Sequence, residues 1–412
     1  MQPIRTFTLY SDSDKEEICC SIYSSIDVIK INREEWDNFV QSVDGDIYLS
    51  YDWCAAWCKF YTKNRHLRIF VFRKNNIIVG LVPMFFETVR IWPIDFRLAK
   101  PIGSDFTIAI INFPVVTRLA EELFSSVFDY LLNSDGCDAV WIGPVGEKYN
   151  ALQYLQFTAR KSTNARGIRI NSRSIYTIFN LPSTFEEYVN SLSKRQRGNL
   201  KRDSNLIEKN FKMTVDIIRD EMFVEAEFKK FIDMHTIQWK HYNKLGHFND
   251  WPLSIKFNTK IALLNAKYGR LRMHRLILDG RVVSYQLCYA FGNKWYWRLP
   301  ARLVGDEWDR YALGRIGLIK EIESAIKEEH INEIEAGPGH YEYKIKLGGK
   351  ELCLYKIFLI NKNIGSYCKS IIFLAFARII NYLYYRLWFC KVAPKLPFKR
   401  RSLWELWIRT RL

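Results

Sequence analysis

The sequence has few of the features that mark a secreted or metal-dependent protein. Its nine cysteines are odd in number, form no CxxC pair, and include the adjacent Cys19 and Cys20, so they do not indicate a disulfide framework. Cys54 and Cys58 are four residues apart in an aromatic segment, and we expect them to pack a helix rather than bind metal. The first 17 residues are polar and acidic, without a signal-peptide core. Together these absences predict a reduced, cytoplasmic setting.

The motifs of several large enzyme classes are also missing. There is no Walker loop, no Rossmann fingerprint after a first strand, no HExxH and no nucleophile elbow. Nucleotide hydrolysis, hydride transfer and serine hydrolysis therefore have little support. His235, His241 and His247 do not share one helical face, so we expect no metal site there.

What the chain has is length, apolar residues and positive charge. Its 412 residues, 48% of them apolar, are enough for two domains with separate cores. The 61 Lys and Arg exceed the 44 Asp and Glu by 17. This balance favours anionic partners: nucleic acid, an acidic membrane surface or a phosphate-rich small molecule. It does not choose among them.

The two halves of the chain show one order of elements used twice: a strand, two helices, a hairpin, a helix and a strand. This order predicts an α/β or α+β fold. Residues 1–25 are expected to form a flexible lead, 26–165 an N-terminal domain, 166–361 a C-terminal catalytic domain, and 362–412 a basic tail. The elements expected in the first half are strands at 26–31, 67–72, 77–86, 106–113 and 139–142 and helices at 32–43, 52–61 and 119–132. Those expected in the second half are strands at 176–181, 271–278, 282–291, 295–299, 333–336 and 352–360 and helices at 185–192, 195–210, 229–244 and 314–329.

The tail carries more than half of the net charge, because eleven Lys and Arg face one Glu over residues 362–412. Residues 371–390 are strongly apolar, but Arg378 and Arg386 interrupt them, and each central arginine costs a spanning helix about 2.5–3.5 kcal/mol. These arginines share one helical face with Asn381, Tyr382 and Tyr385. This pattern favours a helix lying in the membrane interface. A helix packed on the catalytic domain and a spanning helix are the alternatives.

A glycine-marked helix start is expected at residues 310–317. Gly314 and Gly317 would let the backbone approach an anion, and the free N–H groups of a helix start stabilise phosphate. Arg310 and Arg315 would add charge-assisted contacts. Tight packing is the alternative reason for the two glycines.

Residues 335–344 carry the groups best suited to proton transfer. A Gly-Pro-Gly turn ends a strand and is followed by Tyr343, which can donate a proton to a leaving thiolate. Glu335 or His340 can accept a proton from an amine, directly or through water. Lys344 can hold a phosphate or stabilise an oxyanion.

Two further groups of residues are candidates for binding the substrate. The segment 193–202 is cationic, with Lys194, Arg195 and Arg197 at its start, and either binds an anion or forms a solvated helix face. His235 and Trp239 end a helix before an aromatic loop, which makes His235 a candidate residue of the substrate cleft.

Several short motifs resemble the CelD-like acetyltransferases of the GNAT superfamily, which are related to the FemAB peptidoglycan aminoacyltransferases. In the first half these are Leu49-Ser-Tyr-Asp-Trp53 with Trp57, Val79-Gly-Leu-Val-Pro-Met84 and Gly103-Ser-Asp105. In the second half they are Leu192-Ser-Lys-Arg195 with Arg197, His235 with Trp239 and Gly246, Leu313-Gly314, and Gly337-x-Gly339 with Tyr343-Lys344. The resemblance covers about residues 26–360. Relatives often have serine-proline where this chain has Ala312-Leu313.

The resemblance implies two tandem GNAT-like domains with mixed, mostly antiparallel sheets flanked by helices, the C-terminal one active. It implies an acyl-CoA donor, acetyl-CoA in the first place, with its pyrophosphate at Gly314, and direct attack of an amine or hydroxyl on the thioester. Tyr343 and Lys344 would lie at the cleft. The expected acceptor is a cell-envelope or polysaccharide precursor, and the basic tail would place a cytoplasmic enzyme at the inner face of an anionic membrane. The alternatives are a Fem-like transferase that uses aminoacyl-tRNA and a non-catalytic, membrane-docked interaction protein.

Overall fold

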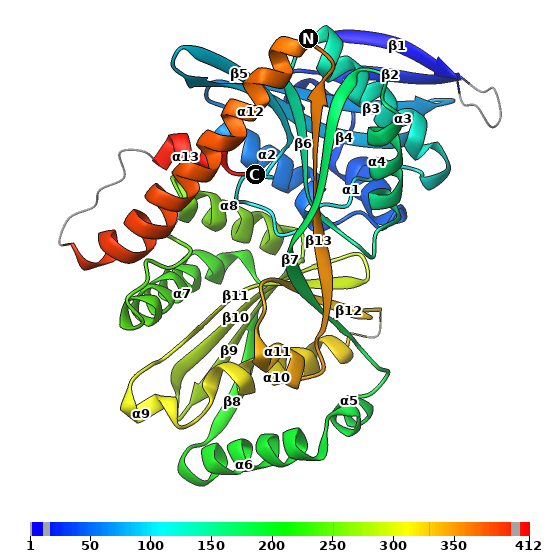
Figure 1. Cartoon of the computed structure of the whole chain (residues 1–412). Helices are drawn as coiled ribbons and strands as arrows, with labels where there is room; N and C mark the ends of the chain where they lie inside the picture. Colours follow the sequence, from blue (N-terminus) through cyan, green and yellow to red (C-terminus); the bar gives the residue numbers. More distant parts are fainter. Residues whose placement is uncertain (1, 11–16, 250, 329, 397–403) are drawn as a thin grey trace. The chain divides into compact units, whose positions relative to one another are not determined.

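The computed structural model describes residues 2–10, 17–249, 251–328, 330–396 and 404–412. The chain divides into two compact units, one made of Met1–Ser174 with Cys353–Leu412 and the other of Ile175–Leu352 (Figure 1). This division differs from the expected one, because the last long strand and the tail belong to the first unit rather than to the catalytic domain or to a separate segment.

Unit 1 is a mixed sheet with helices. Its strands follow the order β1-β2-β3-β4-β5-β6-β13, and all neighbours are antiparallel except β5 and β6. Its elements are β1 (Arg5–Tyr10), β2 (Glu17–Tyr23), η1 (Ile26–Val28), α1 (Arg33–Ser42), η2 (Ile47–Leu49), α2 (Tyr51–Tyr61), β3 (Arg65–Lys74), β4 (Ile77–Ile91), β5 (Ile94–Pro101), η3 (Thr117–Leu119), α3 (Ala120–Asp129), η4 (Tyr130–Ser134), β6 (Ala139–Gly146), α4 (Asn150–Lys161), the first part of β7 (Ala165–Asn180), most of β13 (Lys350–Asn361), α12 (Ile364–Ile379), η5 (Ile380–Val392), η6 (Ala393–Lys395) and α13 (Trp404–Thr410).

Unit 2 repeats this plan. Its strand order is β8-β9-β10-β11-β12-β7, antiparallel except for the pair β11 and β12. The parallel pair thus has the same place in both sheets, which confirms the repeated layout and the tandem α/β fold expected from the sequence. The remaining elements are α5 (Phe185–Ser191), α6 (Lys194–Asn210), β8 (Met213–Ile218), α7 (Glu221–His241), α8 (Ser254–Lys267), β9 (Leu271–Leu278), β10 (Arg281–Phe291), β11 (Lys294–Arg302), α9 (Asp306–Asp309), α10 (Leu313–Ile326), β12 (Glu333–Pro338) and α11 (Glu342–Lys346).

Local signals fixed several elements as expected. The side chain of Asn32 accepts a hydrogen bond from the Glu35 amide and begins α1. The turn between β9 and β10 uses Asp279 and Gly280, both with positive φ (46° and 79°), as the Asp-Gly pair predicts.

Three expectations for the first unit were wrong. Where a strand was expected at 26–31, residues 26–28 form a short 3₁₀ helix and residues 29–31 are irregular, because the Ser25 side chain accepts from the Asp27 amide and starts a turn. Residues 106–113 are nearly all buried but form turns, with one isolated bridge from Ile111 to Val145. The supposed flexible lead contains β1 and β2, and Ile18, Cys20 and Ile22 of β2 are fully buried in alternation. Residues 11–16 lie outside the described part.

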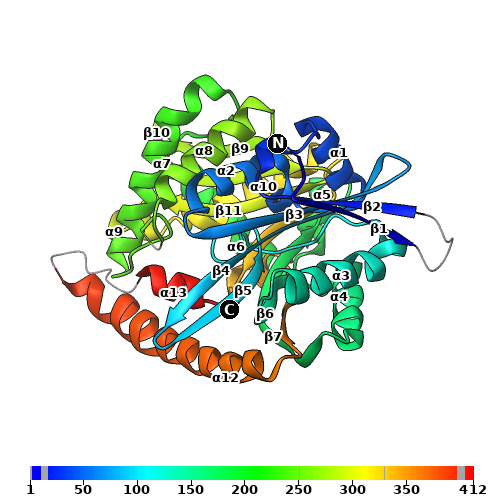
Figure 2. The ribbon, with the colours of Figure 1, turned by 90° about the horizontal axis from the view of Figure 1, so that it is seen from above.

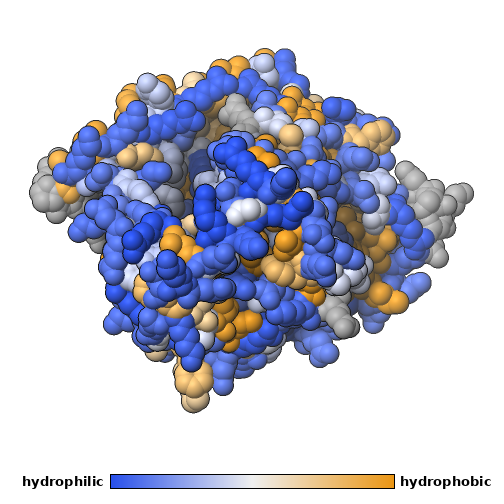
Figure 3. All heavy atoms as spheres, turned by 90° about the horizontal axis from the view of Figure 1, so that it is seen from below, coloured by the Kyte–Doolittle hydropathy of each residue, from blue (hydrophilic) through white to orange (hydrophobic). Residues whose placement is uncertain are grey.

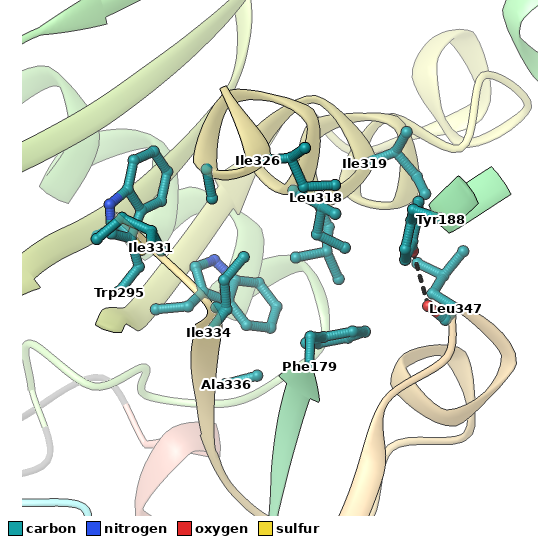
Figure 4. Packing of buried hydrophobic residues seen from close by; sticks show 14 of the residues in the cluster. Phe179, Tyr188, Trp295, Leu318, Ile319, Ile326, Ile331, Ile334, Ala336 and Leu347 are labelled. Atoms are coloured by element: carbon teal, nitrogen blue, oxygen red, sulfur yellow. Dashed lines mark hydrogen bonds between the residues drawn. The ribbon is translucent and has the colours of Figure 1, made fainter. Parts of the chain in front are cut away.

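The core of unit 2 lies between its sheet and α10 (Figure 4). Trp295 and Ile334 from the sheet meet Leu318 of α10, and burial of such side chains stabilises by about 1.5–3 kcal/mol each. Tyr188 of α5 closes the cluster and donates a hydrogen bond from its hydroxyl to the Leu347 carbonyl over 2.7 Å. Because Leu347 directly follows α11, this core holds α10 and α11 together.

Helices α7 and α10 cover opposite faces of the sheet of unit 2. On β10, the ring of Tyr285 meets that of Phe231 on α7 at 5.9 Å between centroids. Three residues along the same strand, the Cys288 thiol donates to Glu321 of α10 over 2.8 Å. Side chains of a strand alternate between its two faces, so Tyr285 and Cys288, three residues apart, lie on opposite faces. The pairing of β10 with β11 also shifts between Leu287 and Cys288. The sheet therefore separates the surroundings of α7 from those of α10.

The tail packs on unit 1, whereas the sequence analysis had considered packing on the C-terminal domain. Phe373 of α12 is fully buried and stacks on Phe96 of β5, with the ring centroids 4.2 Å apart. Figure 2 shows α12 running beside β5. The opposite side of the helix exposes Ile371, Ile372 and Ile379 by 43–53%. Within the described part of the chain, residues Ile364–Lys395 form a helix that is long and apolar enough to cross a membrane, by length and composition alone.

Candidate active site

The start of α10 leaves backbone N–H groups available to a ligand. Ala312 precedes the helix in the left-handed conformation (φ 53°, ψ 36°), and its side chain makes no capping hydrogen bond. A left-handed alanine costs about 1–2 kcal/mol, so the tertiary structure holds this turn against a local preference. The expected helix start at Gly314 is confirmed, and its uncapped first turn suits an anion.

Three arginines lie around this helix start. Arg302 is close to Gly314, since a methyl group there would come within 3.5 Å of its Cδ, and its guanidinium donates to Asp309 over 2.7 Å. Arg310 donates to the hydroxyl of Tyr311 over 2.6 Å. Arg315 forms an ion pair with Asp203 of α6. The sequence therefore named two of the three cations, while Arg302, at the end of β11, was missed.

Gly317 lies one turn into α10 and has a packing role. A Cβ at this position would come within 2.4 Å of Gln286 Nε2, a distance that real Cβ atoms do not reach. Gln286 in turn accepts a hydrogen bond from the Trp297 indole over 2.9 Å. The Nζ atom of Lys344 lies 5.1 Å from the centre of the Trp297 ring. Gly317, Gln286, Trp297 and Lys344 thus form a continuous chain of contacts from α10 to α11.

Lys344 is a buried lysine with an altered pKa. Only 4% of it is exposed, its Nζ donates to the Ala336 carbonyl over 2.5 Å, and the Tyr341 ring centre lies 4.6 Å away. Burial lowers the pKa of Lys344 from 10.5 to about 8, and the opposing effect of Glu351 is smaller. Such a lysine changes its charge close to neutral pH, a property typical of catalytic groups.

Tyr343 precedes Lys344 on the short helix α11, where the sequence had suggested a loop. Burial of its hydroxyl, followed by Tyr341 and Glu321, raises the pKa of Tyr343 above its usual value of 10. The hydroxyl therefore keeps its proton at neutral pH. The residue as a whole is 38% exposed.

The two proposed proton acceptors have different surroundings. Glu335 is buried in β12 between Ile334 and Ala336, which both belong to the core on the α10 side, so its own side chain lies on the other face of the sheet. His340 is exposed and shares a hydrogen bond of 2.8 Å between its Nδ1 and Glu351 Oε1. The turn before it, with Gly337 and Gly339 at positive φ, confirms the expected break of the strand.

His235 lies away from Lys344, among aromatic rings on the α7 face. Its Nε2 is 3.2 Å from Nδ1 of His247, and the rings of Trp239 and Phe248 lie 5.8 and 5.0 Å away. Burial, with a smaller contribution from His247, lowers the pKa of His235 well below 6.5; burial, with Arg298, lowers that of His247 to about 4. Both imidazoles are neutral at pH 7. The structure therefore does not bring His235 and Trp239 together with Tyr343 and Lys344.

The cationic segment begins α6, as expected from the sequence. Lys194 and Arg195 are exposed, whereas Arg197 donates to the carbonyls of Asn190 and Leu192 and so joins α5 to α6. Lys346, and with it Arg195, lowers the pKa of Glu342 at the start of α11. Helix α6 lies at the lower edge of Figure 1, and the face seen from below in Figure 3 is largely hydrophilic.

Glu321 is a second buried group that the sequence analysis missed. Burial raises its pKa to about 8, with an opposing hydrogen bond from Cys288, and its Oε2 has no partner in the described part of the chain. Because Glu321 lies in a helix that the sequence predicts to be amphipathic, the pattern gave no sign that this carboxylate is buried. For Gln286 a signal did exist, because Ser284 and Gln286 are polar residues within an otherwise apolar strand.

Within the described ranges no group of three His, Cys, Asp or Glu residues is arranged to hold a metal ion.

One comparison with known protein families matches part of the second unit. A family model described as Acetyltransferase (GNAT) domain matches residues 194–345, which span α6, α10 and α11. No curated protein matches the sequence. The match supports a transferase whose second unit carries a GNAT domain.

The chain is also similar to solved structures. The crystal structure of FemX has a TM-score of 0.59 at 13% identity, covering 81% of this chain and 97% of that chain. A conserved protein of unknown function from Bacteroides thetaiotaomicron has a TM-score of 0.49 at 10% identity, with coverages of 81% and 99%. A tandem GNAT protein from the clavulanic acid biosynthesis pathway has a TM-score of 0.42 at 9% identity, with coverages of 87% and 99%. At these identities the FemX similarity shows the fold alone, and the two lower scores carry no further argument.

Proposed function

We propose that the protein is an acyl-CoA-dependent N- or O-acyltransferase, in the first place an acetyltransferase, acting on a cell-envelope or polysaccharide precursor. The observation that carries the proposal is the chain of contacts from α10 through Gln286 and Trp297 to the buried Lys344. It joins a helix start suited to pyrophosphate to a lysine suited to a developing negative charge. The GNAT match over the same residues supports this combination.

In the proposed reaction, an amine or hydroxyl of the acceptor attacks the thioester carbonyl carbon. The C–S bond breaks as the new C–N or C–O bond forms. Charged Lys344 stabilises the oxyanion on the carbonyl oxygen, and Tyr343, which keeps its proton at neutral pH, donates it to the leaving thiolate. The proton of the attacking group passes through water to His340, which Glu351 orients. Glu335, the other acceptor suggested by the sequence, has its side chain on the opposite face of the sheet and is not assigned this role.

The donor is identified by binding acetyl-CoA and longer acyl-CoAs to the full chain and following acyl transfer by mass spectrometry. We expect Arg302→Ala, beside Gly314, to weaken CoA binding about ten- to a hundredfold, because a charged contact to phosphate contributes about 1.5–3 kcal/mol. Lys256→Ala removes an exposed charge from α8 and should change it less than about twofold. Absence of binding and transfer with every acyl-CoA, in a folded protein, would exclude the proposal.

The second candidate is a Fem-like transferase that uses aminoacyl-tRNA. The exposed cations at the start of α6 and the FemX-like fold favour it. tRNA binding that falls steeply with salt, together with tRNA as the co-purified ligand, would replace acyl-CoA as the donor. CoA as the co-purified ligand would instead support the acyl-CoA-dependent acyltransferase.

We further propose that the enzyme is cytoplasmic and contacts an anionic membrane through α12. The exposed isoleucines Ile371, Ile372 and Ile379 form an apolar stripe on a tail rich in cations. Sedimentation with phosphatidylglycerol vesicles should carry the protein down, and Ile372→Glu with Ile379→Glu should leave it in solution. Ile77→Glu, at a still more exposed isoleucine at the start of β4, should not. Unchanged sedimentation of the double variant would overturn this contact.

A further inference from the structure

Unit 1 contains a cavity that acyl transfer in unit 2 does not use. Its volume is about 640 Å³, within the range of small-molecule sites. The wall consists of β6, the first part of β7, β13, α12, η5 and the end of the chain from Trp407 onward. Since the tail forms one side of it, the cavity exists only because the tail packs on this unit.

The charged side chains around the cavity all have one sign. Five cations line it, and no aspartate or glutamate does so among the described residues: the cations are Arg169, Lys356, Arg378, Arg386 and Arg411. Arg169, Arg378 and Arg386 are exposed and form no ion pair or hydrogen bond within the described chain. Lys356 donates to an oxygen of Leu412 over 2.8 Å. Uncompensated cations at one cavity attract an anionic group such as a phosphate.

The rest of the wall is apolar and aromatic. Phe358, Leu374 and Ala377 line it, and the rings of Tyr385 and Trp407 stack at 4.1 Å between centroids. Trp141, which is 2% exposed, has an indole N–H without an acceptor in the described part of the chain. An unpaired buried donor costs about 1–3 kcal/mol, and a bound polar atom would remove this cost. The cavity thus combines an apolar wall, a free buried donor and a cationic margin.

The position of the cavity on the tail favours a lipid over a soluble anion. The helix α12–η5 lines it with Ala377, Arg378 and Arg386, while Ile372 and Ile379 on the same helix are exposed to solvent. Long arginine side chains at a membrane surface reach the headgroup level, and apolar side chains enter the acyl region.

We propose that the cavity binds one phosphate-bearing lipid, with its headgroup at the arginines and part of its acyl chain against the aromatic wall. The site is distinct from the acyl-transfer site of unit 2 and does not depend on the identity of the donor there. The sequence analysis placed Arg378, Asn381, Tyr385 and Arg386 on one helical face for the membrane interface. In the structure these four line the cavity instead, and the face left for a bilayer is the isoleucine stripe.

The test is calorimetric titration of the full chain with dihexanoylphosphatidylglycerol below its micelle concentration. We expect one saturable site per chain, binding at least about tenfold tighter than dihexanoylphosphatidylcholine, because the headgroup charge differs. The variant Arg378→Ala with Arg386→Ala should weaken binding about ten- to a hundredfold. Lys391→Ala with Lys395→Ala removes the same charge from exposed positions of the same tail outside the cavity wall and should change it less than about twofold.

Four results would overturn the proposal. Equal losses in the two double variants would mean attraction by overall charge alone. Glycerol 1-phosphate binding as tightly as the lipid would mean a phosphate site without a chain site. Uridine diphosphate binding more tightly than the lipid would assign the cavity to a nucleotide. Absence of saturable lipid binding would show that the cavity is not a lipid site. Acyl transfer to a soluble acceptor is measured in parallel. Its loss or retention tests the acyltransferase proposal for unit 2 and not the lipid site of unit 1.

Discussion

Replacing Lys344 by methionine should abolish acyl transfer and at the same time make the protein more stable. The charged lysine stabilises the oxyanion, and loss of such a group lowers kcat by about 10²–10³-fold. The stability gain has a separate cause. At pH 7 the buried ammonium is charged although its surroundings favour the neutral form, since burial lowers its pKa from 10.5 to about 8. A shift of this size corresponds to up to about 3 kcal/mol, less about 1 kcal/mol for the lost hydrogen bond to Ala336.

The same pKa sets the pH dependence. In the wild type we expect activity to fall as pH rises through about 8, because Lys344 loses the charge that the reaction needs. Stability should rise between about pH 8 and 10.5, since only the unfolded chain still binds the proton there. Lys344→Met should show no such rise. Lys344→Arg, where the site accommodates it, should keep activity without the alkaline fall.

These outcomes are measured by pH profiles of transfer and by chemical unfolding at several pH values. Lys346→Met is the matched control, because Lys346 is on the same helix, exposed and paired with Glu342. It should change activity less than about twofold and stability less than about 1 kcal/mol. If Lys344→Met retains full transfer, Lys344 has no catalytic role, and retained function in cells would favour a non-catalytic interaction protein.

Replacing Arg65 by methionine should destabilise unit 1 by about 3–5 kcal/mol. Arg65 lies in the interior, where its Nε donates to Glu87 over 3.1 Å and its Nη2 is 2.8 Å from Asp105. Both carboxylates are fully buried. Glu87 keeps Lys100 as an ion-pair partner at 3.5 Å, so the substitution mainly leaves Asp105 without its arginine. A buried charge without a partner is far more costly than the pair itself.

Urea unfolding followed by circular dichroism gives the size of this effect, with each transition fitted separately. Arg90→Met breaks an ion pair with Asp95 whose side chains are 77% and 51% exposed, and it should cost less than about 1 kcal/mol. Adding Asp105→Asn to Arg65→Met should recover part of the loss, because the stranded charge is removed. Similar small losses for Arg65→Met and Arg90→Met would show that the buried network contributes little.

The site was only partly predictable, and the residues show why. Gly314 and the turn at Gly337–Gly339 were recognised because glycine and proline leave local signals. Tyr343 and Lys344 were named through a resemblance, but the burial of Lys344, and with it the shift of its pKa, depends on Trp297 and Tyr341. His235 shares a sequence neighbourhood with plausible binding residues, yet it lies on the α7 face. Arg302 had no local signal, because its proximity to Gly314 depends on where β11 ends.

By itself the sequence determined many of the elements and their repeated order, because caps, turns and hydrophobic period act over a few residues, but not those at 5–10, 17–23, 26–31 and 106–113. Only the tertiary structure decided which residues meet. It assigned β13 and the tail to unit 1, where strand pairing with β6 and burial of Phe373 outweigh chain proximity to the second unit. It also placed Lys344 against Trp297 and enclosed a cationic cavity behind α12. Contacts between residues far apart in the chain depend on the packing of whole elements, and no local pattern specifies them.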